Sequence, residues 1–171
     1  MVFGFRRAEE GDLPVIWELI REAKARVPSP DWFETEDAAF AGKHIAEEGF
    51  TILVESGEEH PAVVGLMMVR LPGGAADNLG TYLPLDEEEM GKVAHLEIAV
   101  VAPEAQGNAL QYRLFCVAEE MLRERGYRYL MATVHPENRY SLVNMEKLGM
   151  KCVAEVKKYG GLRRFVMVKS L

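Results

Sequence analysis

The chain has 171 residues, of which 49% are hydrophobic and 27% are charged. This length suits one domain with its own core, and the composition excludes disordered and fibrous classes. The 20 basic and 27 acidic residues give a net charge of -7, so we expect no nucleic-acid partner. No apolar run has the length of a membrane span or a signal peptide, so we expect a cytoplasmic protein with no membrane partner.

The cysteines and histidines show no spacing typical of a disulfide framework or a metal site. Cys116 falls in a helical pattern and Cys152 in a strand pattern, and we expect both to be small buried side chains. We therefore predict no metal. We also disfavour Cys116 as a nucleophile, because a core thiol is not activated.

The N-terminal half predicts a strand, two helices and two further strands. A short strand near Phe3 leads to Asp12 and Pro14, which are typical of a helix start, and apolar residues at helical spacing continue to about Val27. The predicted elements that follow are a helix over 38–48 and strands over 50–55 and 62–70.

Residues 71–94 are rich in Gly, Asp and Glu and have no clear periodicity. Connections longer than about 12 to 15 residues are usually functional or mobile, so this inserted loop is a candidate lid over a substrate. Its acidic run 86–89 is interpreted as a solvated surface, with attraction of a cationic acceptor as the alternative.

From residue 96 onward the pattern is strand, loop, helix, strand, helix and hairpin. The apolar run 96–101 ends before Pro103, and the loop 106–111 opens an amphipathic helix that Gly126 would end. The N–H groups and dipole at such a helix N-terminus form an anion site, which a pyrophosphate would fit. The elements predicted next are a strand over 129–134, a helix from Asn138 to Gly149, and strands over 150–159 and 162–171 around a two-residue Gly160-Gly161 turn.

These residues resemble the signature of the GNAT superfamily of N-acyltransferases, in which a strand ending V-x-P-x-x precedes [QR]-x-x-G-x-[GA] and a helix. Val101 and Pro103 occupy the strand end, and 106–111 occupies the loop. The spacing of a downstream family motif, N-x-x-A-x-x-x-Y-x-x-x-G-[FY], is matched by Asn138, Ser141, Met145, Gly149 and Met150. The resemblance spans nearly all of residues 1–171, read as a single domain. It implies an α/β (α+β) fold with a mixed, mostly antiparallel central sheet of six to seven strands flanked by about four helices.

The resemblance further implies an N-acetyltransferase that uses acetyl-CoA. The pyrophosphate would lie on the loop, whose implied binding residues are Gln106, Gly107, Asn108, Ala109, Leu110 and Gln111. The pantetheine arm would lie beside the strand residues Ala99, Val100 and Val101, much as an added strand does. Asn138 and Ser141 would face the arm from the other side. Asn138 has a second interpretation as the N-cap of its helix.

Glu97 interrupts an otherwise apolar strand, where a carboxylate is costly to bury without a partner or a purpose. It is our candidate general base, because a protonated amine must lose a proton before it attacks a thioester. Pairing of Glu97 with a basic side chain is the alternative. His95 lies two residues earlier on the same face and is a second candidate base. Tyr140 and Tyr159 are candidates for the acid that protonates the departing thiolate.

Three positions depart from the family pattern. Ala109 and Gln111 replace glycines of the loop, and Met145 replaces a tyrosine that often protonates the thiolate. Ala109 is tolerated if its torsions are helical, and Gln111 could bind the phosphate or ribose. The departures support an alternative function, a non-catalytic protein that binds or senses acyl-CoA.

The expected acceptor is a small-molecule or peptide primary amine, and protein lysine, amino acids, polyamines and aminoglycosides all remain open. The variable regions 28–40 and 71–94 would form its pocket. Direct transfer in a ternary complex is the predicted mechanism. A homodimer is possible, because the strand ending at Leu171 is a predicted sheet edge that could pair across a two-fold axis.

Overall fold

The computed structural model describes residues 2–171, and its centre is a seven-stranded sheet in the order β1-β2-β3-β4-β5-β7-β6. All neighbouring strands are antiparallel except β4 and β5, which are parallel. The strands are β1 (Phe3–Arg7), β2 (Gly49–Ser56), β3 (Ala62–Arg70), β4 (Val93–Val101), β5 (Tyr129–Val134), β6 (Lys151–Lys158) and β7 (Leu162–Ser170). The predicted mixed, mostly antiparallel sheet is therefore confirmed.

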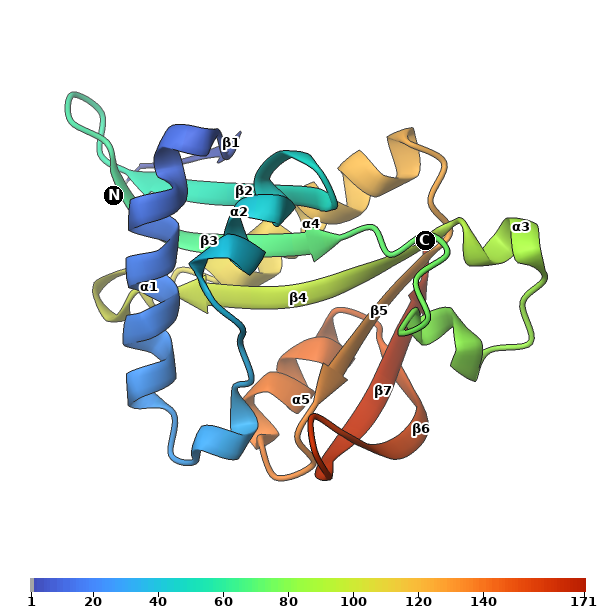
Figure 1. Cartoon of the computed structure of the whole chain (residues 1–171). Helices are drawn as coiled ribbons and strands as arrows, with labels where there is room; N and C mark the ends of the chain where they lie inside the picture. The colour runs from blue at the N-terminus through green and yellow to red at the C-terminus, as the bar shows by residue number, and fades with distance from the viewer. Residues whose placement is uncertain (1) are drawn as a thin grey trace.

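Helices cover both faces of this sheet. In Figure 1, α1 and α2 lie in front of β2, β3 and β4, while α4 lies behind the same strands. The helices are α1 (Leu13–Arg26), α2 (Ala38–Ala46), α3 (Glu87–Met90), α4 (Leu110–Glu124) and α5 (Arg139–Lys147). Four match the predicted helices, and the fifth, α3, lies within the segment predicted to be a loop.

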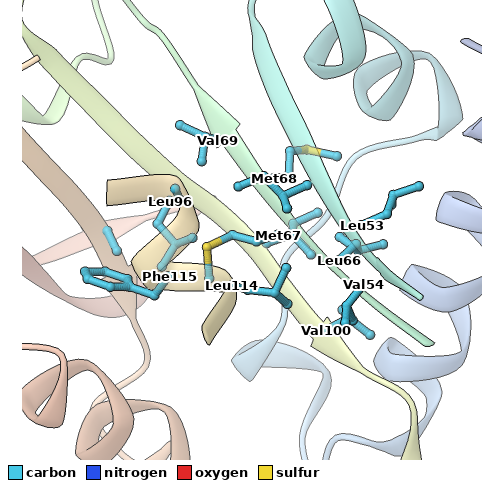
Figure 2. Close-up of a cluster of buried hydrophobic side chains, with 14 of the residues drawn as sticks. Leu53, Val54, Leu66, Met67, Met68, Val69, Leu96, Val100, Leu114 and Phe115 are labelled. Atoms are coloured by element: carbon cyan, nitrogen blue, oxygen red, sulfur yellow. The ribbon is translucent and has the colours of Figure 1, made fainter. Parts of the chain in front are cut away.

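The core lies on both faces of the middle strands, under α4 on one face and under α1 and α2 on the other. Figure 2 shows Leu66, Met67, Met68 and Val69 of β3 among the buried side chains of the neighbouring strands. Leu114 and Phe115 reach this cluster from α4. β3 is buried on both faces because helices cover both, which explains its unbroken apolar run.

The parallel strands β4 and β5 separate soon after they meet. Their pairing covers only Val93–His95 and Tyr129–Met131, although β4 continues to Val101 and β5 to Val134. Figure 1 shows the two strands diverging from that point. The remainder of β4 therefore offers backbone groups on its β5 side that no strand pairs, as the resemblance implied.

The 71–94 segment is folded against the sheet. It contains the short helix η3 (Leu79–Tyr82) as well as α3, and Leu79 is buried beside Val93 and Met131. The Asn78 side chain donates hydrogen bonds to the carbonyls of Gly73 and Met90 and so ties the two ends of the segment together. The acidic run 86–89 caps and forms α3, which agrees with its interpretation as a surface feature.

The β6–β7 connection differs from the predicted two-residue turn. Lys158 pairs with Leu162, which leaves three residues in the loop. All three have positive φ, with 51° at Tyr159, 79° at Gly160 and 109° at Gly161. Because Tyr159 takes a left-handed conformation, β6 ends one residue earlier than expected and Tyr159 belongs to the loop tip.

Three further expectations are wrong. Cys116 is exposed because the buried stripe of α4 is formed by Leu114, Phe115, Ala118 and Leu122, which lie on another side of the helix. Cys152 is exposed because β6 is an edge strand with little cover. The strand ending near Leu171 is not a sheet edge, since β7 lies between β5 and β6.

Candidate active site

Two neighbouring pockets lie along the free end of β4. We call the first the loop pocket; its volume is about 310 Å³, and it lies between the 105–112 segment and α5. We call the second the strand pocket; its volume is about 490 Å³, and it lies where β4 and β5 diverge. Gln111 and Leu148 line both pockets, so the two are adjacent.

The loop pocket is built around the N-terminus of α4. Gly107 and Ala109 have positive φ, and helix α4 begins directly afterwards at Leu110. The first helical hydrogen bond runs from the Arg113 amide to the Ala109 carbonyl, so the amides of the preceding turn are free of helical partners. Lys147 of α5 lines the same pocket. Free amides, a helix dipole and an ammonium group together favour an anion.

Most residues expected to bind the cofactor line one of the two pockets. Those in the loop pocket are Val101, Gln106, Gly107, Ala109, Leu110 and Gln111, and those in the strand pocket are Ala99, Gln111, Asn138 and Ser141. Two lie elsewhere. The Val100 side chain is in the core, and the Asn108 side chain folds back to the carbonyls of Ala105 and Gln106 at 2.9 and 3.2 Å. Asn108 therefore holds the loop in shape.

Ala109 takes the left-handed conformation at the start of α4, with φ of 52°. The helical torsions that would make alanine harmless are thus not observed. A residue with a Cβ pays about 1–2 kcal/mol for this conformation, whereas glycine does not. The loop keeps the geometry expected of a glycine at some cost in stability.

Two side chains of the loop region have partners within the protein. The Gln111 side-chain oxygen accepts a hydrogen bond from the Asn144 amide at 3.2 Å, which joins α4 to α5. The Asn138 side chain accepts from the Ser141 amide at 3.2 Å and so caps α5, while Asn138 also lines the strand pocket. The N-cap interpretation of Asn138 is confirmed, and contact with a cofactor remains compatible with it.

Glu97 lies at an irregularity of β4. Leu96 pairs with Val69 and Ile98 with Met68, so Glu97 is the extra residue of a β-bulge. A bulge redirects a side chain out of the regular alternation. Glu97 lines the strand pocket, with its side chain 22% exposed. The carboxylate is therefore in the cavity and still in contact with water.

His95 is bonded in a way that rules it out as the base. Its Nε2 accepts a hydrogen bond from the Leu79 amide at 2.9 Å, so in the neutral ring the proton is on Nδ1. Nδ1 lies 3.5 Å from Glu97 Oε1, and the residue is only 3% exposed. The predicted proximity of His95 and Glu97 is thus observed, but the basic nitrogen of His95 is already occupied.

Arg70 completes the surroundings of Glu97. Its guanidinium forms two hydrogen bonds with Asp77, at 2.7 and 2.9 Å, and lies 4.0 Å from Glu97. Hydrogen bonding to Arg70 lowers the pKa of Asp77. The stronger partner of Arg70 is Asp77, so the carboxylate of Glu97 is left with a weak ion pair and access to the cavity.

The two candidate tyrosines lie in different pockets. Tyr140 lines the loop pocket and is 72% exposed. Tyr159 lines the strand pocket, and its hydroxyl is 3.4 Å from Thr133 Oγ1 of β5. Although half of the Tyr159 side chain is exposed, partial burial raises its pKa, and the Glu97 charge adds to this rise. Only Tyr159 shares a cavity with Glu97.

Other residues of the strand pocket carried no motif in the sequence. They come from segments far apart in the chain and include Trp32, Phe33, Asp77, Lys158 and Arg164. One signal was available: Arg164 is a charged residue inside a strand, the same feature that singled out Glu97. The other residues lie in loops or at strand ends, where charged and aromatic side chains are common.

The described part of the chain, residues 2–171, holds no group of three or more His, Cys, Asp or Glu side chains arranged to bind a metal ion. Within the same residues, none of the helices combines the length and the apolar character that a membrane crossing requires.

Strand β4, which diverges from β5, leads into the N-terminus of α4, and this is the arrangement expected of an acyltransferase. The model of the acetyltransferase (GNAT) family matches residues 15–150, and the chain belongs to this family. No curated protein matches the sequence significantly.

Solved structures share the fold at low sequence identity. NAA60 from Arabidopsis thaliana, solved with acetyl-CoA, has a TM-score of 0.79 at 11% identity and covers 99% of this chain and 100% of its own. The yncA protein of Salmonella typhimurium, solved with acetyl-CoA as its cofactor, has a TM-score of 0.70 at 17% identity, over 100% and 95%. The ribosomal-protein-alanine N-acetyltransferase from Brucella melitensis has a TM-score of 0.69 at 22% identity, over 98% and 99%.

Proposed function

We propose that this acetyltransferase moves an acetyl group from acetyl-CoA to a primary amine. The observation that carries the proposal is the pair of adjacent pockets along β4, one at the N-terminus of α4 and the other containing Glu97. This arrangement suits an elongated, bent substrate that carries phosphates at one end and a reacting group at the other.

The residues of the loop pocket fit a pyrophosphate. Amides of the turn from Gly107 to Tyr112 would donate hydrogen bonds to it, and Lys147 would supply a positive charge. A Cβ added to Gly107 would meet nothing within 4 Å, so the space beside the loop is open. The pantetheine amides would bond to the backbone of β4 that β5 leaves unpaired, from Leu96 to Val101.

In the strand pocket, Glu97 takes a proton from the amine of the acceptor, directly or through a water. The amine nitrogen then attacks the thioester carbonyl, and the carbon–sulfur bond breaks. Tyr159 would give its proton to the departing thiolate, because it lines the same pocket as Glu97 and a tyrosine hydroxyl is protonated at neutral pH. A thiol with a pKa of about 8.5 is already a tolerable leaving group, so the contribution of Tyr159 is the smaller of the two.

Transfer is direct, in a ternary complex. A two-step scheme would need a nucleophile in the cavity, and Cys116 is exposed outside the lining of both pockets. Initial rates measured against both substrates should give intersecting lines in a double-reciprocal plot, and Cys116→Ser should retain full activity. Parallel lines together with an inactive Cys116→Ser variant would contradict direct transfer.

The proposal is tested by binding and turnover together. Acetyl-CoA should raise the melting temperature saturably, since a ligand of the native state stabilises it by mass action. A panel of primary amines should then release free thiol from acetyl-CoA. Binding without turnover of any amine would favour the non-catalytic acyl-CoA sensor. Absence of any shift at millimolar acetyl-CoA would overturn both functions.

A charge reversal in the loop pocket provides a matched control for binding. Lys147→Glu should weaken acetyl-CoA by about tenfold or more, because it places a carboxylate near the phosphates. Lys151→Glu is an equal change of charge on an exposed residue of β6, outside both pockets, and should leave the affinity unchanged.

A further inference from the structure

Two of the three Lys and Arg side chains that line the strand pocket, Lys158 and Arg164, are free of ion pairs with residues 2–171. The third, Arg70, is neutralised by Asp77 at 2.7 Å. Arg163, the neighbour of Arg164 on the opposite side of β7, pairs with Glu155 at 2.6 Å. Within the hairpin, the basic side chains that line the cavity therefore lack ion pairs, whereas Arg163 on the other side of β7 has one.

Arg164 is the more unusual of the two, because it is only 2% exposed. Its guanidinium donates to two backbone carbonyls, to Asp31 at 2.6 Å and to Arg163 at 2.8 Å. These carbonyls satisfy hydrogen bonds without neutralising the charge. Burial lowers the pKa of Arg164, while Tyr159, Glu34 and Asp31 oppose this, and neither carboxylate is within ion-pair distance. A buried cation that forms no ion pair is costly, so this position favours an anionic ligand.

The geometry connects this cation to the proposed base. The Arg164 guanidinium lies over the Tyr159 ring, 5.3 Å from its centroid. The negative charge of Glu97 also acts on this tyrosine and contributes to its raised pKa. Arg164, Tyr159 and Glu97 therefore line one pocket, with Tyr159 next to the cation and within the influence of the carboxylate. Lys158 precedes Tyr159 directly and lines the same wall.

Another part of the pocket lining carries aromatic side chains together with two carboxylates. Trp32 and Phe33 come from the segment between α1 and α2, and Phe40 comes from α2. Glu34 and Glu36 of the same segment also line the pocket. These rings offer an apolar surface to a side chain of the acceptor. The phosphates of acetyl-CoA would lie in the loop pocket, so they do not account for the two free cations of the strand pocket.

We propose that the acceptor is a small α-amino acid with an apolar or aromatic side chain, whose carboxylate is bound by Lys158 and Arg164 while its amine faces Glu97. This proposal rests on the proposed acetyl transfer. It separates amino acids from polyamines and aminoglycosides, which carry no carboxylate, among the acceptors that the family resemblance left open.

The test compares acceptors that differ only in the carboxylate. Phenylalanine, phenylalaninamide and phenethylamine, and the same series from leucine, are assayed by thiol release at saturating acetyl-CoA. The amino acids should have a kcat/KM at least about tenfold above that of the amides and amines, mainly through KM, as expected for one charge-assisted contact. Equal or better use of the amides, or of spermidine, would overturn the proposal. If no amine releases thiol, the proposed acetyl transfer itself has failed.

Variants of the β6–β7 hairpin test which residue binds the carboxylate of the acceptor. Lys158→Met should lower the acid-to-amide ratio of kcat/KM by about tenfold. Lys157→Met is the matched control, because Lys157 is exposed, adjacent in β6 and outside the pocket lining. Arg164→Lys keeps the charge but removes the planar fork and should raise KM for amino acids more than for amides. An unchanged ratio in Lys158→Met would contradict the assignment whether or not the Arg164 variant folds.

Discussion

The loop pocket and the strand pocket are built from different kinds of chemical group. The loop pocket is made mainly from one stretch of chain, residues 101–112, and α5 with the adjoining Leu148 forms its other flank. Its binding groups are backbone amides at a helix N-terminus. The strand pocket takes residues from β4, β5, α5, the β6–β7 hairpin and the segments around Trp32 and Asp77. Its binding groups are charged and aromatic side chains.

This difference predicts how the two pockets respond to substitution. Backbone amides tolerate changes of side chain, so the loop can keep its shape with Ala109 and Gln111 in place of glycines. Side chains held by tertiary contacts tolerate fewer substitutions, because each depends on partners from other segments. We therefore expect substitutions in the strand pocket to change turnover and selectivity, and substitutions in the loop pocket to change cofactor affinity and stability.

The largest effect is expected for Glu97→Gln, which keeps the shape of the side chain and removes its basicity. Loss of a general base lowers the rate by about 10²–10⁴-fold, so kcat/KM should fall by at least about 100-fold. Acetyl-CoA binding, measured by thermal shift, should be unaffected because Glu97 lies outside the loop pocket. An unchanged rate across the pH profile would remove Glu97 from the mechanism.

The next largest effect concerns His95, which links the 71–94 segment to Glu97. His95→Leu leaves the buried Leu79 amide without its acceptor and should cost about 1–3 kcal/mol of stability. The midpoint of denaturant unfolding measures this loss. His60→Leu, in the exposed turn between β2 and β3, is the control and should change stability by less than about 0.5 kcal/mol. Equal stability of the two variants would show that the Leu79 contact contributes little.

Tyr159→Phe is expected to lower kcat by about tenfold, the lower range for loss of a proton donor whose leaving group is already acceptable. Because burial raises the pKa of Tyr159, the hydroxyl stays protonated through mildly alkaline pH. Any loss of activity that its ionisation causes should thus appear only above the ordinary pKa of tyrosine. Tyr140→Phe, in the other pocket, should behave as wild type. The reverse outcome would restore Tyr140 as the acid.

The smallest effect is expected for Ala109→Gly. Glycine adopts the observed φ of 52° without a Cβ penalty, so the variant should be more stable by about 1 kcal/mol or bind acetyl-CoA more tightly. Thermal shift with and without acetyl-CoA separates the two effects. A loss of stability would mean that the greater freedom of glycine in the unfolded chain outweighs the relieved strain.

Much of the fold was predictable because its elements carry local signals. The apolar periodicity of α1 and α4, the strand runs of β2 and β3, and the loop from Gln106 to Gln111 are all visible in short windows of sequence. The errors arose where tertiary context decides. Cys116 is exposed because of the side from which α4 packs, and β7 became an interior strand because β6 folds back beside it.

The candidate site divides in the same way. Sequence alone predicted the location of the loop pocket and drew attention to Glu97, because a loop that opens a helix and a charge within an apolar strand are local features. Only the tertiary structure decided that His95 is occupied by Leu79, that Tyr159 and not Tyr140 lies near Glu97, and that Arg164 faces the cavity unpaired. These facts depend on contacts between residues tens of positions apart, which no short window of sequence contains.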